Sequence, residues 1–327
     1  MAFVMLRLNF LHPDPTDPGQ MSDRYRAGVE LAEYADQHGV AMVSTEEHQA
    51  TRIGWSPAPL ITASMILSRT EHLSVAISAL LVPLHDPVRL AEQLAVIDLV
   101  SKGRISITTG LGYRPSEYVA LGEDWSRRGK TLDHCLETML AVWSGEPFEL
   151  HGETIQCGPM PYTRPHPLVM VGGSSPAAAR RAARFGLPLQ APAADPELEA
   201  LYRAECDRQG TTPVFIAPHD VAMVHIVDDP DRAWAELGHH FWLEASTYQS
   251  WQPVGQTSAV HSHARDVRQL RDEGIYQFLT PDQAIDRIRR TGALALHPLC
   301  GGMPIEAAWS SLQLLFDRVL PATNAHP

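Results

Sequence analysis

The stretch from Ser74 to Arg89 is the sequence feature that most constrains the fold. It opens with a run of Val, Ile and Leu, which is typical of a strand buried on both faces of a parallel sheet. Asp86 and Pro87 then predict a helix start, because aspartate caps free backbone N–H groups and proline loses no hydrogen bond at the first helical position. Inside the strand, the small residues Ser78 and Ala79 indicate either a tight helix–sheet contact or a flat ligand against the backbone.

The same strand–helix alternation repeats along the chain. About eight such units predict an α/β protein with one (β/α)8 TIM-barrel domain covering residues 1–327. An open doubly wound sheet is the alternative, but the residues after the first strand contain no G-x-G-x-x-G fingerprint. We expect further strands at residues 3–10, 40–45, 104–109, 168–171, 187–191 and 221–227, and helices from Ser22 to Gly39 and at residues 57–68, 131–143, 176–186, 197–209 and 230–245.

Two segments interrupt this rhythm and are expected to be insertions. Residues 145–167 are rich in proline and glycine, and we expect a short hairpin there. Residues 246–266 are polar and without periodicity, which predicts either a solvated loop or a lid over a site. The last part of the chain is expected to add a helix, a strand and a helix.

Charge and composition exclude several classes of partner. The net charge of −12 argues against nucleic acid and against anionic lipid, because both need a basic face. The N-terminal apolar stretch is interrupted by Arg7 and Asn9, so we expect neither a signal peptide nor a membrane span. The four cysteines are far apart and form no C-x-x-C motif, which indicates buried thiols. We therefore expect a cytoplasmic enzyme.

His48 is the first candidate catalytic residue. It follows the second expected strand, and in a barrel the chemistry lies on the loops after the strands. Its imidazole can exchange a proton near neutral pH, and a neighbouring carboxylate such as Glu47 would raise its pKa. Glu46 and Glu47 are adjacent at a strand end and point to opposite faces, so they are not the paired carboxylates of a glycosidase.

Glycine-rich loops after two other strands are candidate cofactor-binding segments. Gly172, Gly173, Ser174 and Ser175 precede Pro176 and a helix, an arrangement that can bind phosphate or can simply be a turn before a good N-cap.

The loop after the fourth strand is the second such segment. Gly110 and Gly112 leave room for a ligand or make a tight turn, and the adjacent Tyr113 and Arg114 complete the loop, with Arg114 as a possible cation for the phosphate. Histidine groupings at 239–240, at His240 and Glu244, and at 261–263 match no complete ligand set, so we predict no metal.

Residues 78–92, 97–104, 172–176 and 184–188 carry a family resemblance. With them, the chain resembles the bacterial luciferase-like superfamily of flavin- or deazaflavin-dependent oxidoreductases, from the first strand to the last helix. The resemblance implies a (β/α)8 barrel with the flavin at its C-terminal end and a non-proline cis peptide behind the flavin, here at Ser78–Ala79.

The resemblance also assigns His48 to the histidine near the flavin, although Gln49 departs from a second histidine often found there. Gly110 stands where the luciferase branch has a cysteine, and Leu111 where it has a phosphate-binding arginine. Glu47-His48, in place of the Asp-His of the deazaflavin branch, favours FMN over F420.

These residues predict a monooxygenase that uses reduced FMN and oxygen to oxidise a small organic substrate. His48 would manage protons, Ser78 and Ala79 would brace the flavin ring, and the segment 172–175 would hold its phosphate. The alternatives are hydride transfer with F420 or FMN, and a flavin-binding protein without turnover. The resemblance further implies a homodimer. Because the sequence has no nicotinamide fingerprint, we expect the electrons to come from a separate flavin reductase or from transient use of a nicotinamide.

Overall fold

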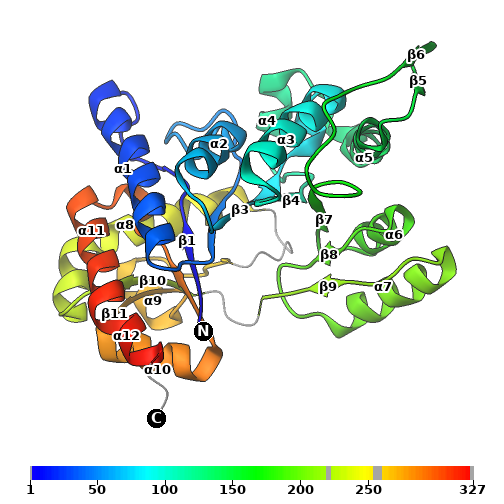
Figure 1. The fold of residues 1–327 in the computed structure, drawn as a ribbon. Coiled ribbons are helices and arrows are strands. Elements are labelled where there is room, and N and C mark those ends of the chain that lie inside the picture. Colours follow the sequence, from blue (N-terminus) through cyan, green and yellow to red (C-terminus); the bar gives the residue numbers. More distant parts are fainter. Residues whose placement is uncertain (1, 219–221, 253–259, 325–327) are drawn as a thin grey trace.

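Parallel strands form the centre of the molecule and helices surround them (Figure 1). The computed structural model describes residues 2–218, 222–252 and 260–324. Every pairing within the ten-stranded sheet is parallel, and its order is β11-β10-β12-β1-β2-β3-β4-β7-β8-β9. The strands are β1 (Phe3–Arg7), β2 (Met42–Thr45), β3 (Ser74–Leu80), β4 (Ile105–Thr109), β7 (Leu168–Gly172), β8 (Leu189–Gln190), β9 (Phe215–Ile216), β10 (Met223–Ile226), β11 (Tyr276–Leu279) and β12 (Ala293–Leu296).

Eight of these strands, β10-β12-β1-β2-β3-β4-β7-β8, follow the order of a (β/α)8 barrel, which confirms the predicted fold class. The last strand, β12, returns to pair with β1, as the strands of a closed barrel do. Two strands are additional: β9 lies beside β8, and β11 lies beside β10. Among the described residues no pairing joins β9 to β11, so the ring of hydrogen bonds is open at that point.

Helices follow most strands. They are α1 (Pro18–Gln37), α2 (Pro59–Arg69), α3 (Pro87–Ser101), α4 (Pro115–Leu121), α5 (Arg128–Ser144), α6 (Pro176–Phe185), α7 (Pro196–Gln209), α8 (Pro230–Trp251), α9 (Val267–Glu273), α10 (Pro281–Thr291), α11 (Ile305–Leu314) and α12 (Leu320–Asn324). Short 3-10 turns lie at Val82–Leu84, Trp125–Arg127 and Cys300–Gly302, and a π-helical turn at Leu315–Val319.

A capping residue followed by proline starts many of these helices. At α3, Asp86 accepts a hydrogen bond from the Arg89 amide, as predicted. The predicted start of α1 at Ser22 is wrong, because Asp17 caps the helix by accepting from Gly19 and Gln20, and Pro18 is its first residue. The helix therefore begins one turn earlier than its apolar periodicity suggests.

The two predicted insertions turn out differently. The expected hairpin is present as the antiparallel pair β5 (Phe148–Leu150) and β6 (Glu153–Ile155). The expected loop from 246 onward is wrong for its first residues, because α8 continues to Trp251. Residues 253–259 lie outside the described residues, and so does Val221 at the start of a predicted strand. The C-terminal part also contains one more strand than predicted, since β11 and β12 are both present.

Apolar side chains from strands and helices fill the space between them in one large cluster, with a smaller cluster around Phe241, Tyr276 and Phe278. None of the described helices is both long enough and apolar enough to span a lipid bilayer.

Candidate active site

His48 lies just past the C-terminal end of β2 and is buried, with 5% of its surface exposed. Both ring nitrogens have partners. Nδ1 lies 3.1 Å from Oε1 of Glu117, and Nε2 lies 3.2 Å from the hydroxyl of Tyr113. Glu117 comes from the first turn of α4 and is completely buried. The carboxylate beside His48 is therefore Glu117, which sequence reasoning missed.

Aromatic side chains enclose the other faces of His48. The ring centroids of Trp251 and Trp55 lie 5.0 and 5.3 Å from that of His48, and those of Tyr113 and Tyr248 lie 5.7 and 6.1 Å away. Tyr248 and Trp251 belong to the last turns of α8, which stand over the histidine where the sequence predicted a polar loop. This cluster keeps water away from the imidazole.

Glu47 points away from His48 and supports the end of β3. Its carboxylate accepts hydrogen bonds from the Leu81 amide at 2.7 Å and from the Gln49 side chain at 2.8 Å, and it pairs with His85 at 2.9 Å. Burial opposes its ionisation, but the hydrogen bonds from His85, Leu81 and Gln49 lower the pKa of Glu47 below its usual value. The structure thus places Glu47 as a brace for β3, with no contact to the imidazole among its hydrogen bonds.

The braced segment contains the predicted cis peptide, which lies between Ser78 and Ala79. The register of β3 against β4 shifts between Ser78 and Leu80, which makes a bulge. Gly110 lies directly beside it: its amide donates to the Leu80 carbonyl, and a Cβ at Gly110 would come within 2.8 Å of the Ala79 Cβ. Ser78, Ala79 and Gly110 therefore form one patch with little side chain, as a flat ring requires.

We predict that Gly110→Ala loses about 1–3 kcal/mol of the free energy of unfolding, because the added methyl group overlaps Ala79 and the bulge must move. It should also weaken binding of FMN. Thermal unfolding and fluorescence titration with FMN measure both effects. The matched control is Gly129→Ala in α5, where the new Cβ would meet only Arg181, at 3.6 Å, and where alanine favours the helix. Equal stability of the two variants would contradict the prediction.

The segment 172–175 ends β7 and leads into α6. A Cβ at Gly172 would lie 2.9 Å from Thr108 and from the Thr109 carbonyl, so only glycine fits there. Ser175 caps α6 through the Ala178 amide. Ser174 lines a cavity of about 380 Å³ together with the segment from Ala191 to Leu198. The lining includes two carboxylates, Asp195 and Glu197, and no basic side chain, so a phosphate at Ser174 would depend on the backbone amides at the start of α6.

Arg114 lies on the His48 side of the site. It donates to Glu117 Oε1 at 3.0 Å and to the Gln49 carbonyl at 2.9 Å, and its guanidinium stacks 4.1 Å above the ring of Trp251. Gly112 turns the loop before it with φ of +69°. Arg114 therefore orients Glu117 and the end of α8.

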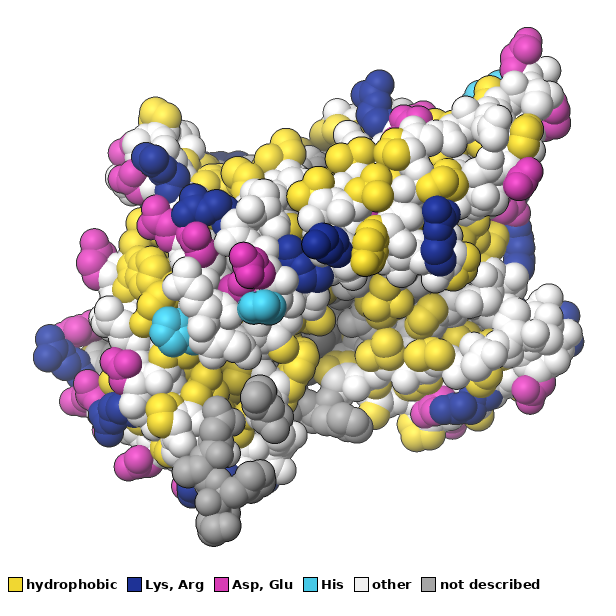
Figure 2. Space-filling model, in the orientation of Figure 1, with side chains coloured by type: hydrophobic (Ala, Val, Ile, Leu, Met, Phe, Trp, Pro, Cys, Tyr) yellow, Lys and Arg dark blue, Asp and Glu magenta, His cyan; other side chains and the backbone are white. Residues whose placement is uncertain are grey.

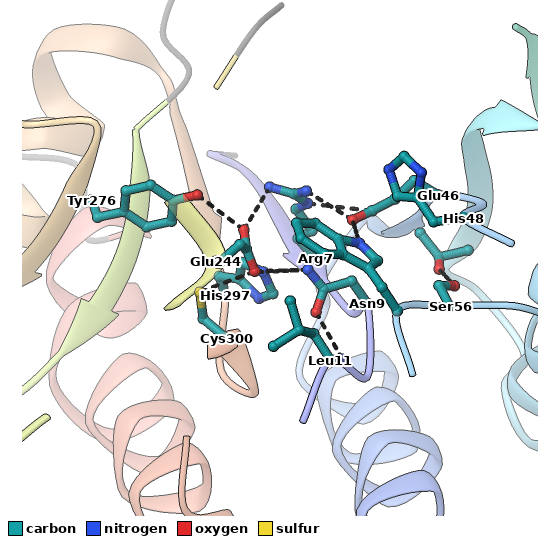
Figure 3. Close-up of polar contacts among 12 residues, drawn as sticks. Arg7, Asn9, Leu11, Glu46, His48, Ser56, Glu244, Tyr276, His297 and Cys300 are labelled. Carbon is teal, nitrogen blue, oxygen red and sulfur yellow. Dashed lines mark hydrogen bonds and ion pairs between the residues drawn. The ribbon is translucent and has the colours of Figure 1, made fainter. Parts of the chain in front are cut away.

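A buried polar network lies between the ends of β1 and β2 and the middle of α8 (Figure 3). Arg7 joins two carboxylates, with Glu46 at 2.8 Å and Glu244 at 3.2 Å. Glu46 also accepts from the Trp55 indole at 2.7 Å, so the network fixes one wall of the aromatic cluster around His48. Glu46 and Glu47 thus point in different directions, as predicted.

Glu244 is the centre of this network. Its Oε2 accepts from Asn9 at 2.7 Å and lies 2.8 Å from His297 and 3.2 Å from Cys300, while Tyr276 donates to Oε1. Burial alone would raise the pKa of Glu244, but His297, Arg7 and Asn9 lower it far below the usual value. Glu244, His297 and Cys300 offer ligand atoms within 4.8 Å of one another and could hold a metal ion. The hydrogen bonds already satisfy the carboxylate without one.

Sequence reasoning did not identify this network. It treated Arg7 and Asn9 as interruptions of an apolar stretch, and it grouped Glu244 with His240 at helical spacing. In the structure, His240 instead bonds the Gly301 carbonyl. The sequence signal was a charged residue inside an expected buried strand, because such a residue needs a buried partner.

The sequence profile of the family "luciferase-like monooxygenase" matches residues 1–296, and the chain belongs to this family. It is 22% identical, over 96% of its length and 94% of the other protein, to the oxygenase component of flavin-dependent trigonelline monooxygenase of Acinetobacter baylyi. It is 26% identical to FMNH(2)-dependent dimethylsulfone monooxygenase of Pseudomonas putida, over 72% of this chain and 71% of that protein. Among solved structures, monooxygenase RslO1 of Streptomyces bottropensis superposes with a TM-score of 0.75 at 23% identity, over 98% of this chain and 99% of that one. The predicted family is confirmed, and the protein is a flavin-dependent oxidoreductase of this class.

Proposed function

We propose that the protein uses reduced FMN and O2 to insert one oxygen atom into a small organic substrate. The observation that carries the proposal is the buried His48–Glu117 pair at the same barrel end as the bare Ser78–Ala79–Gly110 patch. The reaction balances as substrate, FMNH2 and O2 giving oxygenated substrate, FMN and water. Reduced FMN, when bound, supplies the two electrons.

Each part of the site has a task in this proposal. Ser78, Ala79 and Gly110 support the ring of the cofactor, and the segment 172–175 holds its phosphate beside the cavity at Ser174. His48 holds and moves a proton, oriented by Glu117. Trp251 and its aromatic neighbours exclude water from the reacting atoms. Glu47 braces the bulge through the Leu81 amide.

The electrons would come from a separate flavin reductase. Two relatives support this: one is named an oxygenase component and the other FMNH(2)-dependent. The substrates in their names differ, which supports a small organic molecule as the substrate class and does not select one.

The experiment is to supply chemically reduced FMN to the purified protein and to follow oxygen uptake and product mass with a panel that includes trigonelline and dimethylsulfone. Incorporation of one atom from 18O2 into a product supports the proposal. Anaerobic turnover with reduced F420 or FMN would instead establish hydride transfer. Binding of FMN without either reaction would show a flavin-binding protein.

We further propose a homodimer that uses the outer faces of α2 and α3. Hydrophobic side chains gather over these adjacent helices (Figure 2). The exposed ones are Ile61 and Met65 on α2 and Val96, Leu99 and Val100 on α3. Such a patch on neighbouring helices fits a second copy of the same face across a twofold axis. Light scattering should give twice the mass of 36.1 kDa, and Val100→Asp should reduce it to one chain, whereas Val214→Asp, near β9, should not.

We also propose that one domain, residues 1–327, carries the whole site and that the protein works in the cytoplasm. The four cysteines are free, three of them buried, which fits a reducing compartment.

A further inference from the structure

Glu117, His48 and Tyr113 form a linear chain of hydrogen-bonding groups. The carboxylate lies 3.1 Å from one imidazole nitrogen, and the phenol oxygen lies 3.2 Å from the other. This is the arrangement of carboxylate, imidazole and hydroxyl in which a histidine passes protons to and from the hydroxyl. The first two groups are buried, with 0% and 5% of their surface exposed.

The carboxylate end of the chain is held in one orientation. Oε1 of Glu117 accepts from the Gln49 amide at 3.1 Å and from Arg114 at 3.0 Å, in addition to His48. A carboxylate oxygen accepts whereas the Tyr113 hydroxyl can donate, so we place the hydrogen of His48 on Nδ1, pointing at Glu117. Nε2 is then the nitrogen that exchanges a proton with Tyr113.

The phenol end of the chain is held in its protonated form. Burial and the neighbouring Tyr248 raise the pKa of Tyr113 well above its usual value, with smaller contributions from Glu117 and Glu46. Tyr248 hydrogen-bonds to Tyr113, and burial raises its pKa as well. The hydrogen bond to Tyr113 and the charge of Arg7 lower the pKa of Tyr248, whereas Glu46 and Glu244 raise it. At neutral pH Tyr113 is therefore a donor and does not persist as a phenolate.

We propose that Tyr113 is a catalytic residue, the hydroxyl that hands a proton to the reacting oxygen, with His48 and Glu117 as the relay behind it. This rests on the proposed oxygenation, in which the second atom of O2 leaves as water and must be protonated. In the resting protein the hydrogen of His48 is on Nδ1, and Nε2 accepts from Tyr113. During turnover the O–H bond of Tyr113 breaks as the new O–H bond forms. Nε2 takes up one of the two protons that FMNH2 releases, and the resulting imidazolium returns that proton to the phenol oxygen. Glu117 stabilises the imidazolium until the imidazolium has passed its proton to Tyr113.

The kinetic test is Tyr113→Phe, which removes only the hydroxyl. We expect kcat to fall by about 10²–10⁴-fold, with unchanged affinity for FMN, and one limb of the pH–rate profile to disappear. Glu117→Gln should lower kcat in the same range. The control Tyr202→Phe removes a buried hydroxyl that bonds the Leu187 carbonyl in the core and should leave kcat unchanged. An unchanged kcat in Tyr113→Phe overturns the proposal.

A second test uses the protein without flavin, so that it does not depend on the proposed function. In 15N NMR spectra of the imidazole, His48 should carry its hydrogen on Nδ1 and accept at Nε2. Tyr113→Phe should shift the Nε2 resonance and leave Nδ1 in place. The proposed relay is overturned if the flavin-free wild type carries its hydrogen on Nε2, or if Tyr113→Phe leaves the Nε2 resonance unchanged. If the NMR spectra show the relay but the protein takes up no oxygen with reduced FMN, the relay stands and the proposed oxygenation is rejected.

Discussion

Glu244→Ala should lower the free energy of unfolding by about 3–5 kcal/mol, the cost of breaking a buried ion pair by removing one partner. The variant leaves Arg7 with Glu46 alone and takes the acceptor from Asn9, His297 and Cys300, none of which reaches bulk water. Tyr276 also loses its acceptor. Urea unfolding followed by circular dichroism measures the effect.

Two further variants separate charge from shape. Glu244→Gln keeps the volume and one acceptor oxygen and should lose less than Glu244→Ala. Glu236→Ala is the matched control on the same helix, because its partner Arg232 is exposed and the pair is screened by water. A loss in Glu244→Ala no larger than that in Glu236→Ala would show that the network adds little to stability.

The pH dependence of this network has a definite sign. The pKa of Glu244 is lowered in the folded protein, so its contribution to stability is complete above the pKa of the unfolded carboxyl. The contribution is lost as the pH falls through the lower, folded value. The difference in stability between wild type and Glu244→Gln should therefore shrink in acid.

The parts of the fold that could be predicted from the sequence are those determined by residues adjacent in the chain. The apolar run of β3, the Asp86-Pro87 start of α3 and the hairpin at 148–155 each depend on a few consecutive side chains. The small pair Ser78 and Ala79 was also visible, because a strand interior without bulk stands out. The start of α1 was missed because Asp17 precedes the periodic part of the helix.

The parts of the site that the sequence did not predict depend on contacts between distant segments. Glu117 meets a histidine 69 positions earlier in the chain, and Glu244 meets one 53 positions later. Tyr248 and Trp251 follow Glu244 at intervals of four and three residues, which continues one face of α8. Their polar neighbours hid this spacing, so the residues that cover His48 were read as part of a loop.

His48→Asn should lower turnover by about 10²–10⁴-fold, the usual range for loss of a positioned acid–base group. The substitution removes the group between Glu117 and Tyr113, yet Gln49 and Arg114 still satisfy the carboxylate, so the fold and the cofactor patch should persist. Oxygen uptake with reduced FMN, product yield and hydrogen peroxide release measure the result. Because asparagine cannot supply a proton as imidazole does, we expect more of the oxygen to end as peroxide.

His134→Ala is the control for that experiment, since His134 is exposed on α5 and should not affect any of the three measurements. If the His48→Asn variant binds FMN and gives the same product yield as the wild type, His48 has no role in the reaction. The bare patch at Ser78, Ala79 and Gly110 would then be a flavin-binding surface whose reaction depends on other groups. A variant that loses product while its unfolding and FMN affinity stay the same would place the loss in proton transfer, because no other property of His48 would have changed.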